Sequence, residues 1–109
     1  MFVSIKGSPY ARFQRALQLG DLALVHVAAA ELPRIDLDDA LTICVLMARG
    51  HEPSFERAAV RWTARLCLEH PAAGIAEARI ALALFDTMPA DPDGAAEALG
   101  RLRERLAAP

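Results

Sequence analysis

Apolar residues recur along most of the chain with the spacing of amphipathic or buried helices, and Pro, Gly and Asp divide this pattern into six segments. The segments run from Ser8-Pro9 to Leu19, from Asp21 to before Pro33, from Asp36 to Gly50, from about Pro53-Ser54 to before Pro71, from Gly74 to before Pro89, and from about Asp91-Pro92 to about Ala107. Short linkers favour antiparallel neighbours. The sequence therefore predicts an all-α fold of about six short helices, arranged as three antiparallel hairpins.

The apolar faces of the segments predict how deeply each is buried. The last segment carries a narrow stripe, which is typical of a surface helix. The stripe consists of Ala95, Leu99, Leu102 and Leu106. The first segment is similar and is expected to bury Tyr10, Phe13 and Leu17. The second and third segments are apolar nearly all round, which predicts two central helices.

The fourth segment has two apolar faces, which predicts that it is covered on two sides. One face carries Phe55, Ala59, Trp62 and Leu66, and the other carries Val60, Ala64 and Cys67. Along the chain, amphipathic segments at the two ends flank more apolar segments in the middle. This order fits either a compact bundle or a short solenoid with capping helices.

Residues 1–7 are expected to form an N-terminal arm, and residues 8–109 a single helical domain. Only Phe2, Val3, Ser4 and Ile5 alternate in the manner of a strand. Such an arm can pack on the helices or extend into solvent. It can also add to the sheet of a partner or pair with its own copy in a homodimer, so Phe2 and Ile5 are candidate partner-binding residues.

The run from Ala16 to Leu22, with Gly20 between two helices and the small residues Ala28, Ala29 and Ala30 after it, resembles the helix–turn–helix of tetratricopeptide-type repeats. The resemblance covers one hairpin and implies binding of proteins or peptides. The use of Ala, Leu and Arg, with one Lys and no Asn, is similar to that of small bacterial all-helical proteins from GC-rich genomes. That second resemblance implies no activity.

Charge and composition exclude several classes. A chain of 109 residues with a net charge of −2 has the size of one domain and lacks the basic excess of a general nucleic-acid coat protein. The longest apolar runs, Leu22 to Ala30 and Ala40 to Ala48, are too short to span a membrane. Without a recognisable secretion signal, the expected location is the cytoplasm. Cys44 and Cys67 lie within apolar helical patterns and are expected to be core thiols.

Arg57, Arg61 and Arg65 recur every four residues and therefore share one stripe of the fourth segment. Guanidinium groups suit carboxylates and phosphates, so this stripe is a candidate partner-binding surface. The alternative is a solvated ridge that is paired with Glu56, Glu69 and acids of neighbouring helices.

Arg65 and His70 have the R-x4-H spacing that resembles the catalytic motif of HEPN-type ribonucleases, which are small helical dimers. The resemblance implies that His70 acts as general acid or base and that Arg65 holds the phosphate. Leu66 stands where that family usually has a polar residue. The alternative is that His70 complements the dipole at a helix C-terminus.

No other residues form a catalytic, cofactor or metal pattern. Cys67 and His70 make at best half a zinc site, and Ser4, Ser8 and Ser54 lie in the arm or at helix caps. We therefore expect a non-enzymatic protein-interaction or scaffolding module, with a protein partner or a second copy. The alternative is a nucleic-acid-directed helical protein, including the HEPN-like ribonuclease.

Overall fold

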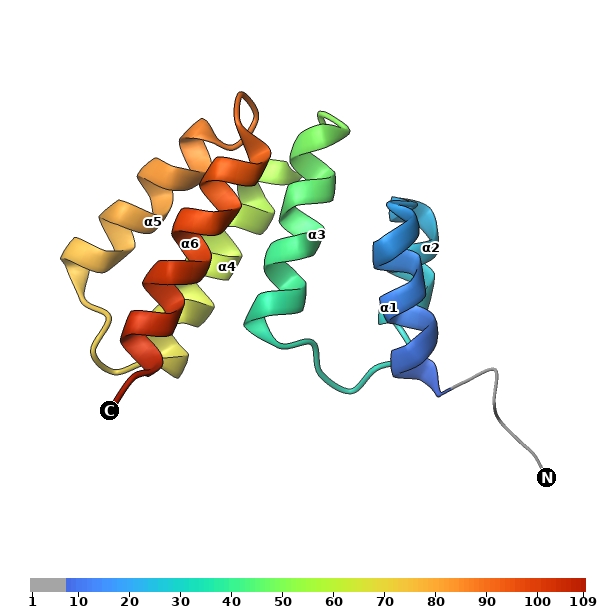
Figure 1. Cartoon of the computed structure of the whole chain (residues 1–109), viewed down its shortest axis with the longest axis horizontal. Coiled ribbons are helices and arrows are strands. Elements are labelled where there is room, and N and C mark those ends of the chain that lie inside the picture. The colour runs from blue at the N-terminus through green and yellow to red at the C-terminus, as the bar shows by residue number, and fades with distance from the viewer. Residues whose placement is uncertain (1–7) are drawn as a thin grey trace.

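A computed structural model describes residues 8–109, which form six α-helices (Figure 1). The helices are α1 (Pro9–Leu19), α2 (Leu22–Ala29), α3 (Leu37–Arg49), α4 (Phe55–Glu69), α5 (Ile75–Thr87) and α6 (Pro92–Ala107). No strand occurs in this part of the chain. The predicted all-α class is confirmed, and the predicted bounds hold closely except that α2 ends at Ala29, short of Pro33.

Side-chain caps explain where four of the six described helices begin. Ser8, Asp21, Asp36 and Asp91 each accept a hydrogen bond from a backbone N–H in the first turn of the helix that follows. Gly20 ends α1 with a φ of 69°, a left-handed conformation that glycine adopts without a steric penalty.

Helices α3 to α6 form a closed bundle around the larger core (Figure 1). Helix α3 packs against α4 and α6, and α5 also packs against α4 and α6. Contact between α3 and α6 closes the group into a ring, as in a bundle rather than in a row of stacked hairpins. The bulky residues at its centre are Leu41, Met47, Trp62, Leu66, Phe85, Met88 and Leu99.

Helices α1 and α2 form a hairpin with a small core of its own, made by Phe13, Ala16 and Val25. The hairpin lies beside α3, where Ile43 and Leu46 pack against this small core. Tyr10 and Gln14 of α1 donate hydrogen bonds to the carboxylate of Asp39 on α3, at 2.9 and 3.1 Å. The bond to Asp39 raises the pKa of Tyr10, because the carboxylate favours the protonated phenol.

Three predictions about depth are wrong. Helix α2 is peripheral, since Val25 is its one buried residue and Val27 is 65% exposed. Tyr10 is 49% exposed, because its hydroxyl is directed to Asp39 at the surface. On α4, the face of Val60 and Ala64 is exposed, because neighbouring helices cover only the face that carries Trp62.

The buried face of α4 is as predicted, and Trp62 is its centre. The indole ring lies edge-on to Phe85, with ring centroids 5.4 Å apart, and its Nε1–H donates to the Leu37 carbonyl at 2.8 Å. The side chain is 2% exposed. Trp62 thus joins α4 both to α5 and to the start of α3.

Replacing Trp62 by Phe removes the indole donor and part of the packed volume. We expect Trp62→Phe to lower the free energy of unfolding by about 2 kcal/mol, because the Leu37 carbonyl loses a buried partner. Val60→Ala, on the exposed face of the same helix, should change it by less than about 0.5 kcal/mol. Urea unfolding followed by circular dichroism measures both, and equal effects would contradict this role for Trp62.

Candidate functional site

A groove lies between α2, α3 and α4 and is the candidate site. Its volume is about 330 Å³, near the lower end of pockets that enclose small molecules. The lining comprises His26, Ala29, Ile35, Ala40, Ile43, Cys44, Met47, Ser54, Arg57, Ala58, Arg61, Trp62 and Arg65. Most of these residues are apolar, and none is acidic. The groove is therefore an apolar channel with cations along one wall.

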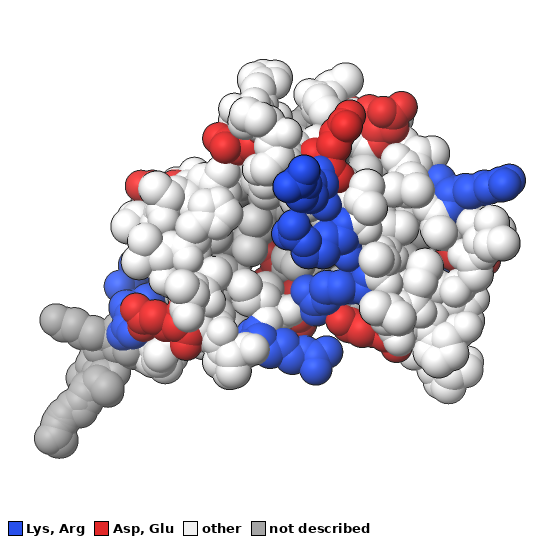
Figure 2. Space-filling view, turned by 180° about the vertical axis from the view of Figure 1, so that it is seen from behind, with Lys and Arg blue, Asp and Glu red and all other residues white. Residues whose placement is uncertain are grey.

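The three arginines of α4 form that wall. Figure 2 shows basic side chains in a column beside a hollow in the surface. Arg57, Arg61 and Arg65 all line the groove, and successive members are separated by about 6 Å along the helix axis. The fourfold spacing in the sequence thus becomes a row of guanidinium groups along one channel.

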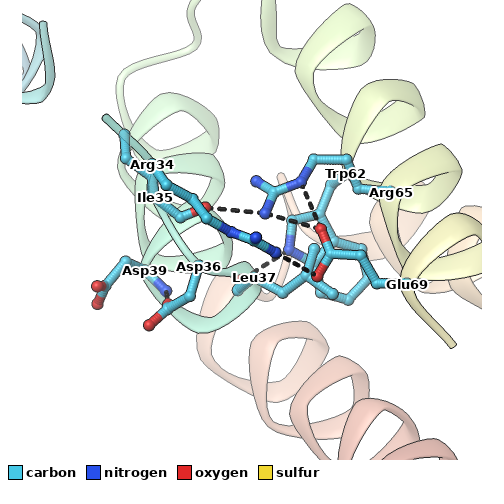
Figure 3. Close-up of polar contacts among 8 residues, drawn as sticks. All are labelled: Arg34, Ile35, Asp36, Leu37, Asp39, Trp62, Arg65 and Glu69. Carbon is cyan, nitrogen blue, oxygen red and sulfur yellow. Dashed lines mark hydrogen bonds and ion pairs between the residues drawn. The ribbon is translucent and has the colours of Figure 1, made fainter. Parts of the chain in front are cut away.

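Arg65 is bound within the fold (Figure 3). Its Nη2 donates to the Ile35 carbonyl at 2.8 Å, and its Nε donates to Glu69 Oε2 at 3.0 Å. Arg34 also approaches Glu69, with 3.7 Å between Nη2 and Oε1. The side chain of Arg65 is 29% exposed, so its bonds form in a partly desolvated position. Arg65 therefore holds the segment before α3 in place.

Arg57 and Arg61 differ from Arg65 in their contacts. Both are exposed, and within residues 8–109 neither makes a hydrogen bond or an ion pair. The alternative of a paired ridge thus describes Arg65 with Glu69, but not the other two arginines. The physical reason is the opposite wall, where α2 and α3 present neutral side chains and His26 rather than carboxylates.

Cys44 belongs to the floor of the groove and is 3% exposed. Burial raises the pKa of its thiol to about 11, and the opposing effect of the Arg61 charge is smaller. The thiol is therefore neutral at physiological pH and contributes apolar surface rather than a nucleophile.

Arg65 and His70 line different depressions. His70 is the C-terminal cap of α4 and lies in a shallow charged hollow with Arg34, Asp36, Asp38, Glu69 and Arg103. Arg65 lines the groove and is bonded to Glu69 and Ile35. No hydrogen bond joins Arg65 to His70 in the part of the chain that the structure describes.

Other candidate chemistry finds little support in residues 8–109. No group of three or more His, Cys, Asp or Glu side chains there is arranged to hold a metal ion. None of the six helices has the length and apolar character needed to cross a bilayer. Phe2 and Ile5 of the expected arm lie outside the described residues.

Comparisons of the chain with protein-family models, curated proteins and solved structures found no match. The tetratricopeptide and ribonuclease resemblances therefore have no relative that tests them.

Sequence reasoning found the arginine wall but missed the rest of the groove. His26, Ile35 and Ile43 come from elements whose position relative to α4 depends on tertiary packing. The one available signal was the absence of acidic residues from the run Leu22 to Ala30, which leaves Arg57 and Arg61 without an acidic partner among residues 8–109.

The two kinds of arginine should differ in stability measurements. Arg65→Ala should lower the free energy of unfolding by about 1–2 kcal/mol, because a charge-assisted bond to the Ile35 carbonyl and the contact with Glu69 are lost. Arg57→Ala should change it by less than about 0.5 kcal/mol. Urea unfolding of the two variants provides the test, and a larger effect at Arg57 would contradict the assignment.

The two cysteines should differ in reactivity. In the native protein, iodoacetamide should modify the partly exposed Cys67 well before Cys44, whose thiol is buried and protonated. Peptide mass spectrometry over time gives both rates, and denaturation in urea should remove the difference. Faster native modification of Cys44 would show that the floor of the groove is open.

Proposed function

We propose that this chain is a non-enzymatic protein-interaction module that binds a segment of a partner protein in the groove between α2, α3 and α4. The observation that carries the proposal is the pair Arg57 and Arg61, two cations with no hydrogen bond or ion pair among the described residues, beside an apolar channel whose described lining holds no carboxylate.

The arginine pair and the apolar channel of the groove both suit a protein partner. Arginine is enriched at the centres of protein interfaces, where its planar group forms bidentate bonds and its stem covers apolar surface. Burial of the apolar lining against a partner gives a favourable free energy, and the two guanidinium groups select the partner by charge.

The described lining of the groove supports binding. Cys44 is a neutral thiol, Arg65 is bonded to Glu69 and Ile35, and no carboxylate of the lining accompanies His26, its one imidazole. The hairpin that resembles tetratricopeptide repeats, α1 with α2, contributes one wall, which agrees with the peptide binding that this resemblance implies.

Both cysteines are free thiols, which agrees with a reducing compartment, and we include a cytoplasmic location in the proposal.

Partner capture with matched variants tests the function. The tagged chain, Arg57→Glu/Arg61→Glu and a control, Arg15→Glu/Arg79→Glu, would each be cross-linked in native cells and purified after nuclease treatment. The control makes the same change in net charge, because it also replaces two Arg by two Glu. Arg15 and Arg79 are exposed and do not line the groove, so the change lies elsewhere on the surface.

We expect one partner protein to be recovered in stoichiometric amount with the parent chain and with the control. The amount recovered with the groove variant, Arg57→Glu/Arg61→Glu, should be at least about tenfold smaller. Circular dichroism should show that all three are equally helical. Identical partners for all three proteins, or recovery of nucleic acid alone before nuclease treatment, would contradict the proposal.

A further inference from the structure

The spacing of Arg57 and Arg61 defines the charge pattern that the groove can bind. Their positions are about 6 Å apart along α4, the same rise that separates residues i and i+4 on any α-helix. Carboxylates at i and i+4 of a second helix, lying alongside α4, would therefore match the two guanidinium groups in register.

The apolar channel next to the arginines defines the rest of the pattern. Ile35 and Ile43 are partly exposed aliphatic side chains, which pack well against Leu, Ile or Met of another helix. The span from Arg57 to Arg65 is about 12 Å, or about two helical turns. A short amphipathic helix has both an apolar stripe and an adjacent row of charges with these dimensions.

Resting on the proposed function, we infer that the occupant of the groove is an acidic amphipathic helix of a partner protein. Its apolar stripe lies in the channel, and carboxylates at i and i+4 pair with Arg57 and Arg61. Charge complementarity selects this occupant, because every charged residue of the lining is a cation.

The aromatic residues favour a peptide over a single-stranded nucleic acid. Such nucleic acids bind on exposed aromatic rings, which stack with the bases. Trp62 is 2% exposed and donates its N–H to Leu37, so its ring is covered. The exposed imidazole of His26 is the one ring that the described lining leaves open to a base, whereas single strands bind on successive rings for successive bases.

A selection experiment tests the occupant without assuming its sequence. A display library of helical segments of about 16 residues, with all positions variable, would be selected on the immobilised full chain. The same library would be selected on Arg57→Glu/Arg61→Glu and on the control Arg15→Glu/Arg79→Glu.

We expect the parent chain and the control to enrich Asp or Glu at i and i+4 beside an apolar stripe. The groove variant should instead enrich Lys or Arg at the same spacing. Such an exchange of charge would show direct contact between the side chains at positions 57 and 61 and the charged row of the selected peptide. Enrichment without charge bias, the same sequences on all three proteins, or no binder that depends on the groove would overturn the inference.

Fluorescence anisotropy then gives affinities for an enriched peptide and for labelled oligothymidine. The peptide should bind the parent chain at least about tenfold more tightly than the groove variant, and added NaCl should weaken binding. Tighter binding of oligothymidine than of the peptide would overturn the inference in favour of nucleic acid.

The two proposals can fail separately. A cellular partner that depends on Arg57 and Arg61 but supplies no acidic helix refutes this inference and leaves the interaction module intact. Selected acidic peptides that bind the groove, with no cellular partner dependent on it, refute the proposed function instead.

Discussion

Two side chains of α4 hold the backbone that connects the α1–α2 hairpin to the four-helix bundle. Trp62 donates to the Leu37 carbonyl and Arg65 to the Ile35 carbonyl, both at 2.8 Å (Figure 3). Ile35 also packs against the small core of the hairpin and lines the groove. Fixing its carbonyl therefore helps to fix where the hairpin lies, and with it the separation of the walls of the groove.

The same helix shows how neighbouring groups assign different roles to identical residues. Arg65 faces Glu69 and a backbone carbonyl, so its charge is satisfied within the fold. Arg57 and Arg61 line the groove with apolar side chains and His26 and have no such partner within the described residues. Their charges remain in water at little cost and are available to a partner, which is the basis of both proposals.

Local signals in the sequence predicted the helices well, because caps act within a few residues. Asp36 and Gly50 bound α3 as expected, and the buried face around Trp62 follows from helical periodicity. How deeply each helix is buried was harder to predict. The apolar α2 is peripheral because none of the other helices within residues 8–109 covers its outer side, which no local pattern encodes. The groove escaped prediction for the same reason, since its walls come from three helices.

The most direct test of the account is the placement of the hairpin in solution, measured by nuclear Overhauser effects in the methyl-labelled full chain. We expect nuclear Overhauser effects between the Phe13, Ala16 and Val25 cluster and the methyl groups of Ile43 and Leu46. In the Arg65→Ala variant these effects between the hairpin and α3 should weaken, while the effects within the α3–α6 bundle persist. Unchanged effects in Arg65→Ala, or none in the parent chain, would contradict the claim that α4 positions the hairpin and forms the groove.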